Sequence, residues 1–303
     1  MTKITVIIPV SPGHVRYILN TLLSLEKGIR KPDEVILITP SMTAKYLMDI
    51  ITNFKLSFEV KIIEMNEPGI GIARKTGIDM AKGDIIAFID ADEIAHSAWL
   101  SNIERHITND RPIIAGRIEY IDEDILKSFS SNVINQPLND HSCHEIEFAP
   151  TANLAFMKFI INEVGNFDPE FIIGHEDTDF IWRIQHRELK VWLCNDIVTY
   201  HVKRSEKFNV RRSFDIGLQT SILFLKHPGK TIKKLMKIPL GYIVILIIST
   251  LLIIKGDINL PILILISPLT YELYRCFRRK YYKKVCLKFI PVRILDQIIY
   301  GLG

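Results

Sequence analysis

The sequence lacks several features that would settle a functional class at once. Its four cysteines show no CxxC spacing, which suits structural thiols in a reducing compartment. Met1-Thr2-Lys3 leads straight into an expected strand, so we expect no signal peptide there. The chain has no internal repeat and no low-complexity tract, so nothing indicates a repeat protein. The cysteines are Cys143, Cys194, Cys276 and Cys286.

Acidic residues are scarce in the last third of the 303 residues. Residues 203–303 contain 19 lysines and arginines but 5 acidic residues, whereas residues 1–202 contain 19 basic and 29 acidic ones. With 48% hydrophobic residues overall, an acidic first part and a basic, apolar tail indicate a membrane surface as partner and exclude nucleic acid. The length allows one large domain with an accessory region, or two domains.

Apolar runs alternate with amphipathic helical patterns in the first part of the chain. Strands are predicted at residues 4–10, 35–39, 58–63 and 85–89, and the segments between them predict helices. Strands alternating with helices imply a mostly parallel sheet with right-handed crossovers. We therefore expect an α/β, Rossmann-like domain of nucleotide-binding type.

The most informative stretch is residues 69–93, GIGIARKTGIDMAKGDIIAFIDADE. It predicts a helix with Arg74 near its start and then a buried strand, which ends in Asp90-Ala91-Asp92-Glu93. Carboxylates just past a buried strand lie where α/β sheets bind ligands. Their mutual repulsion favours a hard divalent cation that also binds substrate phosphates. The alternative is an acidic turn that caps a helix at residues 96–106.

A second acidic cluster lies in residues 174–184, GHEDTDFIWRI. Glu176, Asp177 and Asp179 begin an amphipathic helix, where carboxylates complement the helix dipole. Asp177 facing a cleft could also act as a general base. The residues alone leave both interpretations open.

Three further patterns are weak. Residues 122–143 are polar and irregular, so we expect a mobile loop there. His141-Ser142-Cys143-His144 has metal-ligand character, but no second matched pair accompanies it, and the sequence argues against a zinc site. Gly69-Ile70-Gly71 lacks the third glycine of a dinucleotide-binding fingerprint.

Several ordered motifs resemble those of the family 2 glycosyltransferases, which have a GT-A fold. After a first strand closed by Pro9 come ARKxGxxxAxGDIIAFIDAD, PTANLAF, EVGNFDPEF and GHEDTDFxWR, and the resemblance covers roughly residues 1–225. It implies transfer of a sugar from a nucleotide-diphospho-sugar donor. Asp90-Ala91-Asp92 corresponds to the family's DxD motif, which holds the metal, Mn²⁺ or Mg²⁺, and the donor diphosphate. The implied donor-binding residues are Pro9, Thr39, Arg74, Asp90, Ala91, Asp92 and Asn153.

The same resemblance assigns the chemistry. Asp177, with Glu176 beside it, corresponds to the family's ED motif and would be the catalytic base. His201, in VTYHVKR, resembles a late histidine that gives the metal a further ligand in many members, although a strand-end histidine with an ordinary hydrogen bond is an equal alternative.

One motif departs from the family pattern. Members usually carry an acidic pair after the second strand, and its Asp contacts the nucleobase. This chain has LITPS there, without a carboxylate. Base recognition would therefore rest on Thr39, Ser41 or backbone groups.

The sequence of the C-terminal part predicts a membrane-attachment region. Residues 238–254 carry no charge, and residues 258–271 form a second apolar stretch. Seventeen helical residues span about 25 Å, slightly less than a hydrocarbon core of about 30 Å, so a transmembrane and a re-entrant hairpin both stay open. Lysines and arginines flank both outer sides, which places the catalytic domain and the C-terminus in the cytoplasm. The expected division is a catalytic domain at 1–209, interfacial amphipathic helices at 210–237, the hairpin at 238–274 and a basic amphipathic tail at 275–303.

These patterns together predict a membrane-attached, metal-dependent, inverting glycosyltransferase whose acceptor is lipid-linked or a cell-surface glycan. A nucleotidyltransferase is the alternative enzyme, but it would usually carry a Gly-rich basic loop where residues 10–14 read VSPGH. A catalytically inactive membrane scaffold is the third possibility, against which the intact carboxylate motifs argue.

Overall fold

The computed structural model describes residues 2–67, 69–122, 134–203, 210–237 and 239–255. The chain divides into two compact units, Met1–Ser205 and Glu206–Gly303. The expected second apolar stretch at 258–271 and the basic tail at 275–303 lie outside the described residues, as does most of the expected mobile loop.

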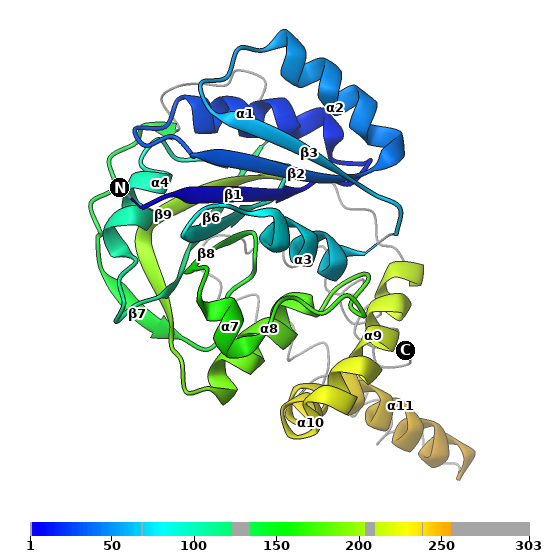
Figure 1. The fold of residues 1–303 in the computed structure, drawn as a ribbon. Coiled ribbons are helices and arrows are strands. Elements are labelled where there is room, and N and C mark those ends of the chain that lie inside the picture. The colour runs from blue at the N-terminus through cyan, green and yellow to red at the C-terminus, as the bar shows by residue number, and fades with distance from the viewer. Residues whose placement is uncertain (1, 68, 123–133, 204–209, 238, 256–303) are drawn as a thin grey trace. The chain divides into compact units, whose positions relative to one another are not determined.

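Four parallel strands form one half of a nine-stranded sheet (Figure 1). They are β1 (Ile4–Pro9), β2 (Glu34–Pro40), β3 (Glu59–Met65) and β4 (Ile85–Ile89), in the order β3-β2-β1-β4. In β1, β2 and β4, the residues that face either side of the sheet are buried, which explains the continuous apolar runs of these three strands. The edge strand β3 is only partly buried. This half of the sheet agrees with the expected parallel layout.

The other half of the sheet is mixed, so the expectation of a mostly parallel sheet is wrong there. It contains β5 (Glu93–Ala95), β6 (Ile113–Asp122), β7 (Cys143–Ile146), β8 (Asn153–Met157) and β9 (Val191–Lys203). β8 pairs antiparallel with both β4 and β6, and β9 pairs antiparallel with β5 and β7 but parallel with β6. The strand–helix alternation that enforces parallel pairing stops after β4, because β5 follows β4 through a short turn.

Helices cover both faces of the sheet (Figure 1). One core contains β1 side chains such as Ile4 and Ile8, and the other contains Ile7, because successive residues of a strand point to opposite faces. The first core takes residues from α1 (Ile18–Glu26), α2 (Ser41–Asn53) and α4 (Trp99–His106), and η1 (Val15–Tyr17) precedes α1. The second takes residues from α3 (Ile70–Met80), α7 (Ile160–Val164) and α8 (Glu176–His186).

The start of α3 is clamped against the segment that precedes α8. The Gly71 amide donates to the Phe171 carbonyl at 2.9 Å. A Cβ on Gly71 would lie 2.1 Å from the Asp168 carbonyl oxygen and 2.8 Å from that of Phe171, so only glycine permits this approach. The clamp brings the first turns of α3 and α8 together.

Cys143 and Cys194 form a disulfide, which corrects the expectation of structural thiols for this pair. The two residues lie directly opposite each other on β7 and β9, with their Cα atoms 4.1 Å apart. Their separation of 51 residues hides this proximity in the sequence. Cys276 and Cys286 lie outside the described residues.

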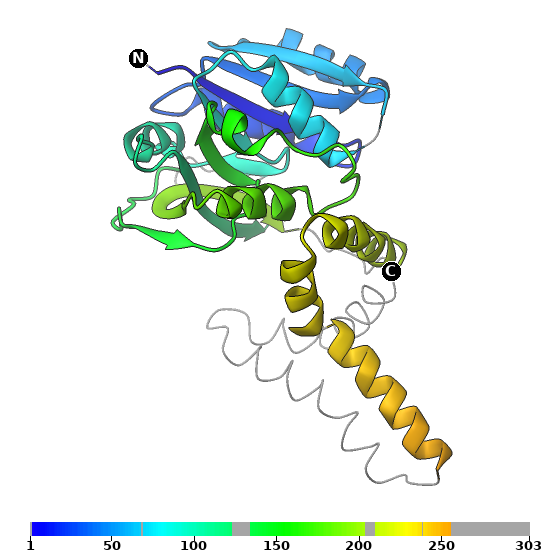
Figure 2. The same ribbon diagram turned by 60° about the horizontal axis from the view of Figure 1, so that its bottom comes forward.

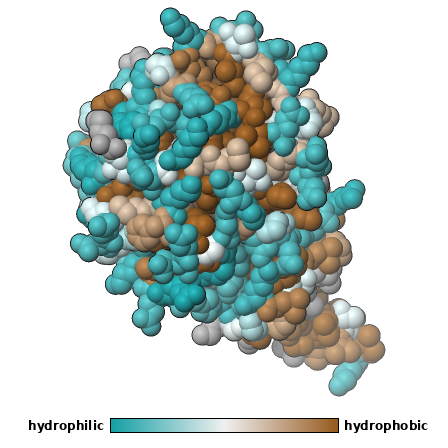
Figure 3. Space-filling model, viewed as in Figure 1, coloured by the Kyte–Doolittle hydropathy of each residue, from teal (hydrophilic) through white to brown (hydrophobic). Residues whose placement is uncertain are grey.

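The described part of the second unit consists of three consecutive helices, α9 (Val210–Lys226), α10 (Pro228–Lys237) and α11 (Pro239–Ile254). Their colours in Figure 2 show them in chain order. Apolar side chains are visible along α11 in Figure 3. Throughout the described part of the chain, we find no helix with both the length and the apolarity needed to cross a membrane.

Candidate active site

The Asp90–Asp92 loop leaves the carboxyl end of β4, beside the carboxyl ends of β1 and β2. The Asp92 side chain is 1% exposed, whereas the Asp90 side chain is 35% exposed. Thr21 of α1 donates a hydrogen bond to the Ala91 carbonyl at 2.9 Å, and the Val202 amide donates to the Asp92 carbonyl at 3.2 Å. The loop is therefore held from both sides. It does not cap α4, because β5 lies between the carboxylates and that helix.

His201 lies next to this loop because β5 pairs with β9. Glu93 and His201 are register partners in that antiparallel pair. The His201 Nε2 atom lies 3.5 Å from Asp92 Oδ2. The fold thus brings together two of the three predicted metal ligands across more than a hundred residues.

Crowded carboxylates dominate the electrostatics of this region. Burial raises the pKa of Asp90, and Asp92 adds to the effect, while the Arg74 guanidinium opposes it. The carboxylates and the imidazole also form a donor set that suits a first-row divalent ion, because such ions accept oxygen and imidazole ligands together. The residues present therefore fit a divalent metal.

Glu93 is the last residue of the acidic run, and the sequence predicted no individual role for it. Its side chain is fully buried. Burial raises the pKa of Glu93 well above its usual value, Asp90 and Asp92 raise it further, and the Thr199 hydroxyl opposes the shift. Its place in the acidic run is the sequence feature that indicates Glu93. Its burial, however, depends on the β5–β9 pairing, which the sequence does not reveal.

Arg74 lies between the two acidic motifs. It is 5% exposed, forms an ion pair with Glu176, and its Nη2 lies 3.8 Å from Asp90 Oδ1. Its guanidinium also lies about 6 Å from the ring centres of Phe88 and Phe167. We expected Arg74 near the nucleotide, and the structure shows that it links α3, the β4 loop and α8.

The three acidic residues at the start of α8 have different surroundings. Glu176 is 4% exposed and faces Arg74; burial raises its pKa, Arg74 opposes this, and Asp177 adds to it. Asp179 is buried in an ion pair with Arg183 at 2.8 Å. Asp177 is partly exposed, and its Oδ1 accepts a hydrogen bond from the Thr178 amide at 2.6 Å. Of the three, Asp177 is the most accessible to a substrate.

Two of the predicted donor-binding side chains are engaged within the fold. Asn153 Oδ1 accepts from Trp99 Nε1 at 2.9 Å, and its Nδ2 donates to the carbonyls of Arg117 and Ile197 at 3.0 and 3.3 Å. Thr39 is fully buried and donates to the Val10 carbonyl at 3.0 Å. Pro9 ends β1 and is partly buried. The predicted donor contacts of these residues stay predictions.

The model of glycosyl transferase family 2 matches residues 5–165, more than half of the chain. This chain belongs to glycosyl transferase family 2. The family match includes Arg74, Asp90, Asp92 and Asn153, and it ends before α8 and β9. The resemblance seen in the sequence is thereby confirmed at the level of the family.

Two curated glycosyltransferases are distant relatives of this chain. A pre-mycofactocin glycosyltransferase of Mycobacterium tuberculosis is 24% identical over 240 residues, covering 75% of this chain and 49% of the relative. Glycosyltransferase AglE of Haloferax volcanii is 24% identical over 159 residues, covering 52% of each. The chain thus spans about half the length of the curated relatives it matches.

Solved glycosyltransferases share the fold. The mannosyltransferase PcManGT of Pyrobaculum calidifontis, in complex with GDP-Man and Mn²⁺, aligns with a TM-score of 0.64 at 14% identity, covering 97% of this chain and 87% of that one. GalNAc-T7 with UDP, GalNAc and Mn²⁺ aligns with a TM-score of 0.53 at 17% identity, covering 68% and 45%. These similarities support a GT-A-like glycosyltransferase fold.

The Arg74–Glu176 pair generates a stability prediction. Arg74→Met should lower the free energy of unfolding by about 3–5 kcal/mol, because it leaves the Glu176 carboxylate buried without its partner. The double variant Arg74→Met/Glu176→Leu should recover much of this loss. Urea denaturation followed by circular dichroism measures both variants.

Lys75→Met is the matched control for this prediction. The neighbouring Lys75 pairs with Asp79 at 2.6 Å, but both side chains are more than 40% exposed, so its loss should cost less than about 1 kcal/mol. If Arg74→Met were no more destabilising than Lys75→Met, the buried pair would not have the role assigned to it.

Proposed function

We propose that this chain is a glycosyltransferase that moves a sugar from a nucleotide-diphospho-sugar to a hydroxyl or phosphate of an acceptor. Family membership supports the class of reaction. The observation that carries the proposal is the link from Asp90 through Arg74 to Glu176, which connects the acidic loop after β4 to the helix that bears Asp177. Such a link holds a donor-side motif and a candidate base in one rigid arrangement.

Asp92, Asp90 and His201 would hold the divalent metal. When bound, the ion would neutralise the charge that develops on the departing nucleoside diphosphate. The imidazole favours Mn²⁺ over Mg²⁺, because Mg²⁺ prefers oxygen ligands alone. The solved structures of GalNAc-T7 and PcManGT contain Mn²⁺, which agrees with this choice.

Asp177 would remove the proton from the acceptor hydroxyl as its oxygen attacks the anomeric carbon. Attack on the face opposite the leaving diphosphate inverts the configuration of the sugar. The partial exposure of Asp177, beside buried Glu176 and Asp179, supports this choice of base. Glu176 would act indirectly, by fixing Arg74 and the start of α8.

Donor binding tests the metal assignment. Asp92→Asn should abolish the Mn²⁺-dependent part of nucleotide-sugar binding and leave the fold intact, because it removes a buried carboxylate charge with little change of shape. Isothermal titration with UDP- and GDP-sugars, with and without Mn²⁺, is the measurement, and Asp110→Asn on the exposed surface is the matched control. Unchanged affinity in Asp92→Asn would refute the assignment.

The same titration separates the alternative functions. A nucleotidyltransferase should bind a nucleoside triphosphate in preference to a nucleotide-sugar, and an inactive scaffold should bind neither. We expect metal-dependent binding of a nucleotide-sugar.

Turnover tests the base. Asp177→Asn should lower the single-turnover rate about a hundredfold or more, the usual scale of general base catalysis, with donor affinity nearly unchanged. Glu176→Gln should be milder, and Glu163→Gln, at an exposed residue of α7, serves as the control. A near-normal rate in Asp177→Asn, or lost donor binding in place of lost rate, would move the base elsewhere.

We further propose that the second unit attaches the enzyme to the cytoplasmic face of the cell membrane, where a lipid-linked or surface-glycan acceptor would be at hand. Four lysines within the ten residues of α10 suit anionic lipid headgroups. On α9, Phe214, Leu218, Phe224 and Leu225 are exposed, as are Ile247 and Leu251 on α11. The 16 residues of α11 span about 24 Å, which favours interfacial or re-entrant insertion.

Vesicle flotation tests the attachment. The full chain should bind vesicles that contain phosphatidylserine, and replacing Lys230, Lys233, Lys234 and Lys237 with Gln should release much of the bound fraction. The matched control replaces the exposed lysines Lys27, Lys45, Lys55 and Lys190. Equal binding of the two variants would contradict the role of α10.

Protease protection in cells tests the topology. It should place both chain ends in the cytoplasm, and ends on opposite faces of the membrane would refute the proposed topology.

A further inference from the structure

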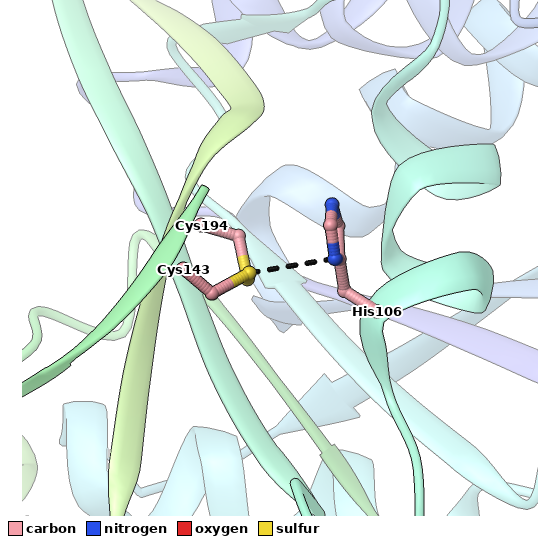
Figure 4. A group of neighbouring side chains, drawn as sticks. All are labelled: His106, Cys143 and Cys194. Atoms are coloured by element: carbon pink, nitrogen blue, oxygen red, sulfur yellow. Dashed lines mark hydrogen bonds between the residues drawn. A yellow bond between two sulfur atoms is a disulfide. The ribbon is translucent and has the colours of Figure 1, made fainter. Parts of the chain in front are cut away.

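A cluster of metal-ligating side chains lies at the other end of β9. Cys143 and Cys194 form the disulfide between β7 and β9, and His106 at the end of α4 turns its ring toward them (Figure 4). His106 Nδ1 lies 3.4 Å from Cys143 Sγ. Candidate ligand atoms of these three residues all lie within 4.8 Å of one another. Cys194 is seven residues from His201 along β9, so this cluster is roughly 20 Å from the candidate active site.

The other nitrogen of His106 is held by a buried carboxylate. His106 Nε2 lies 2.8 and 3.1 Å from the two carboxylate oxygens of Asp196, which is fully buried. An Nε2–H that donates to Asp196 leaves Nδ1 unprotonated and aimed at the sulfur atoms. A carboxylate that orients a histidine in this way is the usual support of a zinc ligand.

Further contacts fix Asp196 in place. His141 Nδ1 lies 2.7 Å from Asp196 Oδ2, and Arg105 forms an ion pair with the same oxygen. Asn102 Nδ2 donates to the Asp196 backbone carbonyl at 2.6 Å. Three side chains on one carboxylate, with a fourth on its backbone carbonyl, exceed what a disulfide needs, because a disulfide requires no oriented imidazole.

We propose that reduction of the Cys143–Cys194 disulfide opens a zinc site formed by Cys143, Cys194 and His106. Two thiolates and one imidazole are a common zinc donor set, with a water in the fourth position. Cys143 is partly exposed, which gives the ion an entry path, while Cys194 and His106 are buried. His141-Ser142-Cys143-His144 thus contributes one ligand, Cys143. The other two ligands come from α4 and β9, which are distant in the sequence and supply no matched pair of ligands.

The redox and proton balance of this step is simple. A dithiol reductant supplies two electrons and two protons, its own sulfurs become a disulfide, and Cys143 and Cys194 become thiols. Zinc binding then displaces one proton from each thiol to solvent. Disulfide and zinc exclude each other, because both use the same two sulfur atoms.

Metal titration tests the site on the full chain. Every variant carries Cys276→Ser and Cys286→Ser, so that no other thiol contributes. The reduced chain, kept free of oxygen, should bind one equivalent of Co²⁺ with a thiolate-to-cobalt charge-transfer band, and Zn²⁺ should displace it. The oxidised chain should bind none. Absence of stoichiometric binding to the reduced chain would overturn the proposal.

Single substitutions test each part of the cluster. Cys194→Ser and His106→Gln should each abolish the one-equivalent site, and Asp196→Asn should weaken it about 10–100-fold. The matched control is His144→Gln, an exposed histidine next to Cys143, which should bind like the parent. Parent-like affinity in His106→Gln would overturn the three-ligand site.

Thermal unfolding guards against variants that fail to fold. Zn²⁺ should raise the melting temperature of the reduced parent chain, because it binds the folded state, and leave that of the oxidised chain unchanged. No rise in the reduced parent would count against the site whatever the variants do.

Discussion

The buried contact of Arg74 with Glu176 and Asp90 is the constraint on which the candidate active site depends. A guanidinium that is 5% exposed is tolerated there because two carboxylates and two aromatic rings surround it. Glu176 in turn tolerates burial because Arg74 is present. The close approach at Gly71 makes this arrangement possible, since it brings the first turn of α3 against the chain that enters α8. Removing Arg74 would leave the Glu176 carboxylate buried without a compensating charge.

The acidic loop after β4 contains more carboxylates than Arg74 alone can neutralise. Asp90 has an opposing cation at 3.8 Å, but Asp92 and Glu93 are buried beside it. Burial raises the pKa of Glu93 well above its usual value, and the neighbouring Asp90 and Asp92 raise it further. A loop with more carboxylates than Arg74 can neutralise favours binding of a cation, and this is the physical basis for the proposed donor site at this edge of the sheet.

Local patterns predicted the parallel half of the sheet, since β1, β2 and β4 are continuous apolar runs and the helices between them have clear periodicity. They could not predict β5, because a strand of three residues is too short to show a periodic pattern. The helix that we expected to begin at residue 96 begins at Trp99, after β5. The Arg74–Glu176 pair spans 102 residues and the disulfide spans 51, so both depend on tertiary packing alone. Family motifs, by contrast, indicated the acidic residues themselves, and the fold brings Asp92 and His201 together.

The proposed donor-binding residues and the candidate base lie in different parts of the fold. Residues assigned to the donor lie on the parallel half and its first antiparallel neighbour, within the region that the family model matches. The candidate base and His201 lie on α8 and β9, beyond that region. β9 pairs with β5, β6 and β7, so one strand of 13 residues holds His201 at one end and Cys194 near the other. A change at the cysteine end that alters the pairing of β7 with β9 would therefore act on the strand that positions His201, without any contact between the two sites.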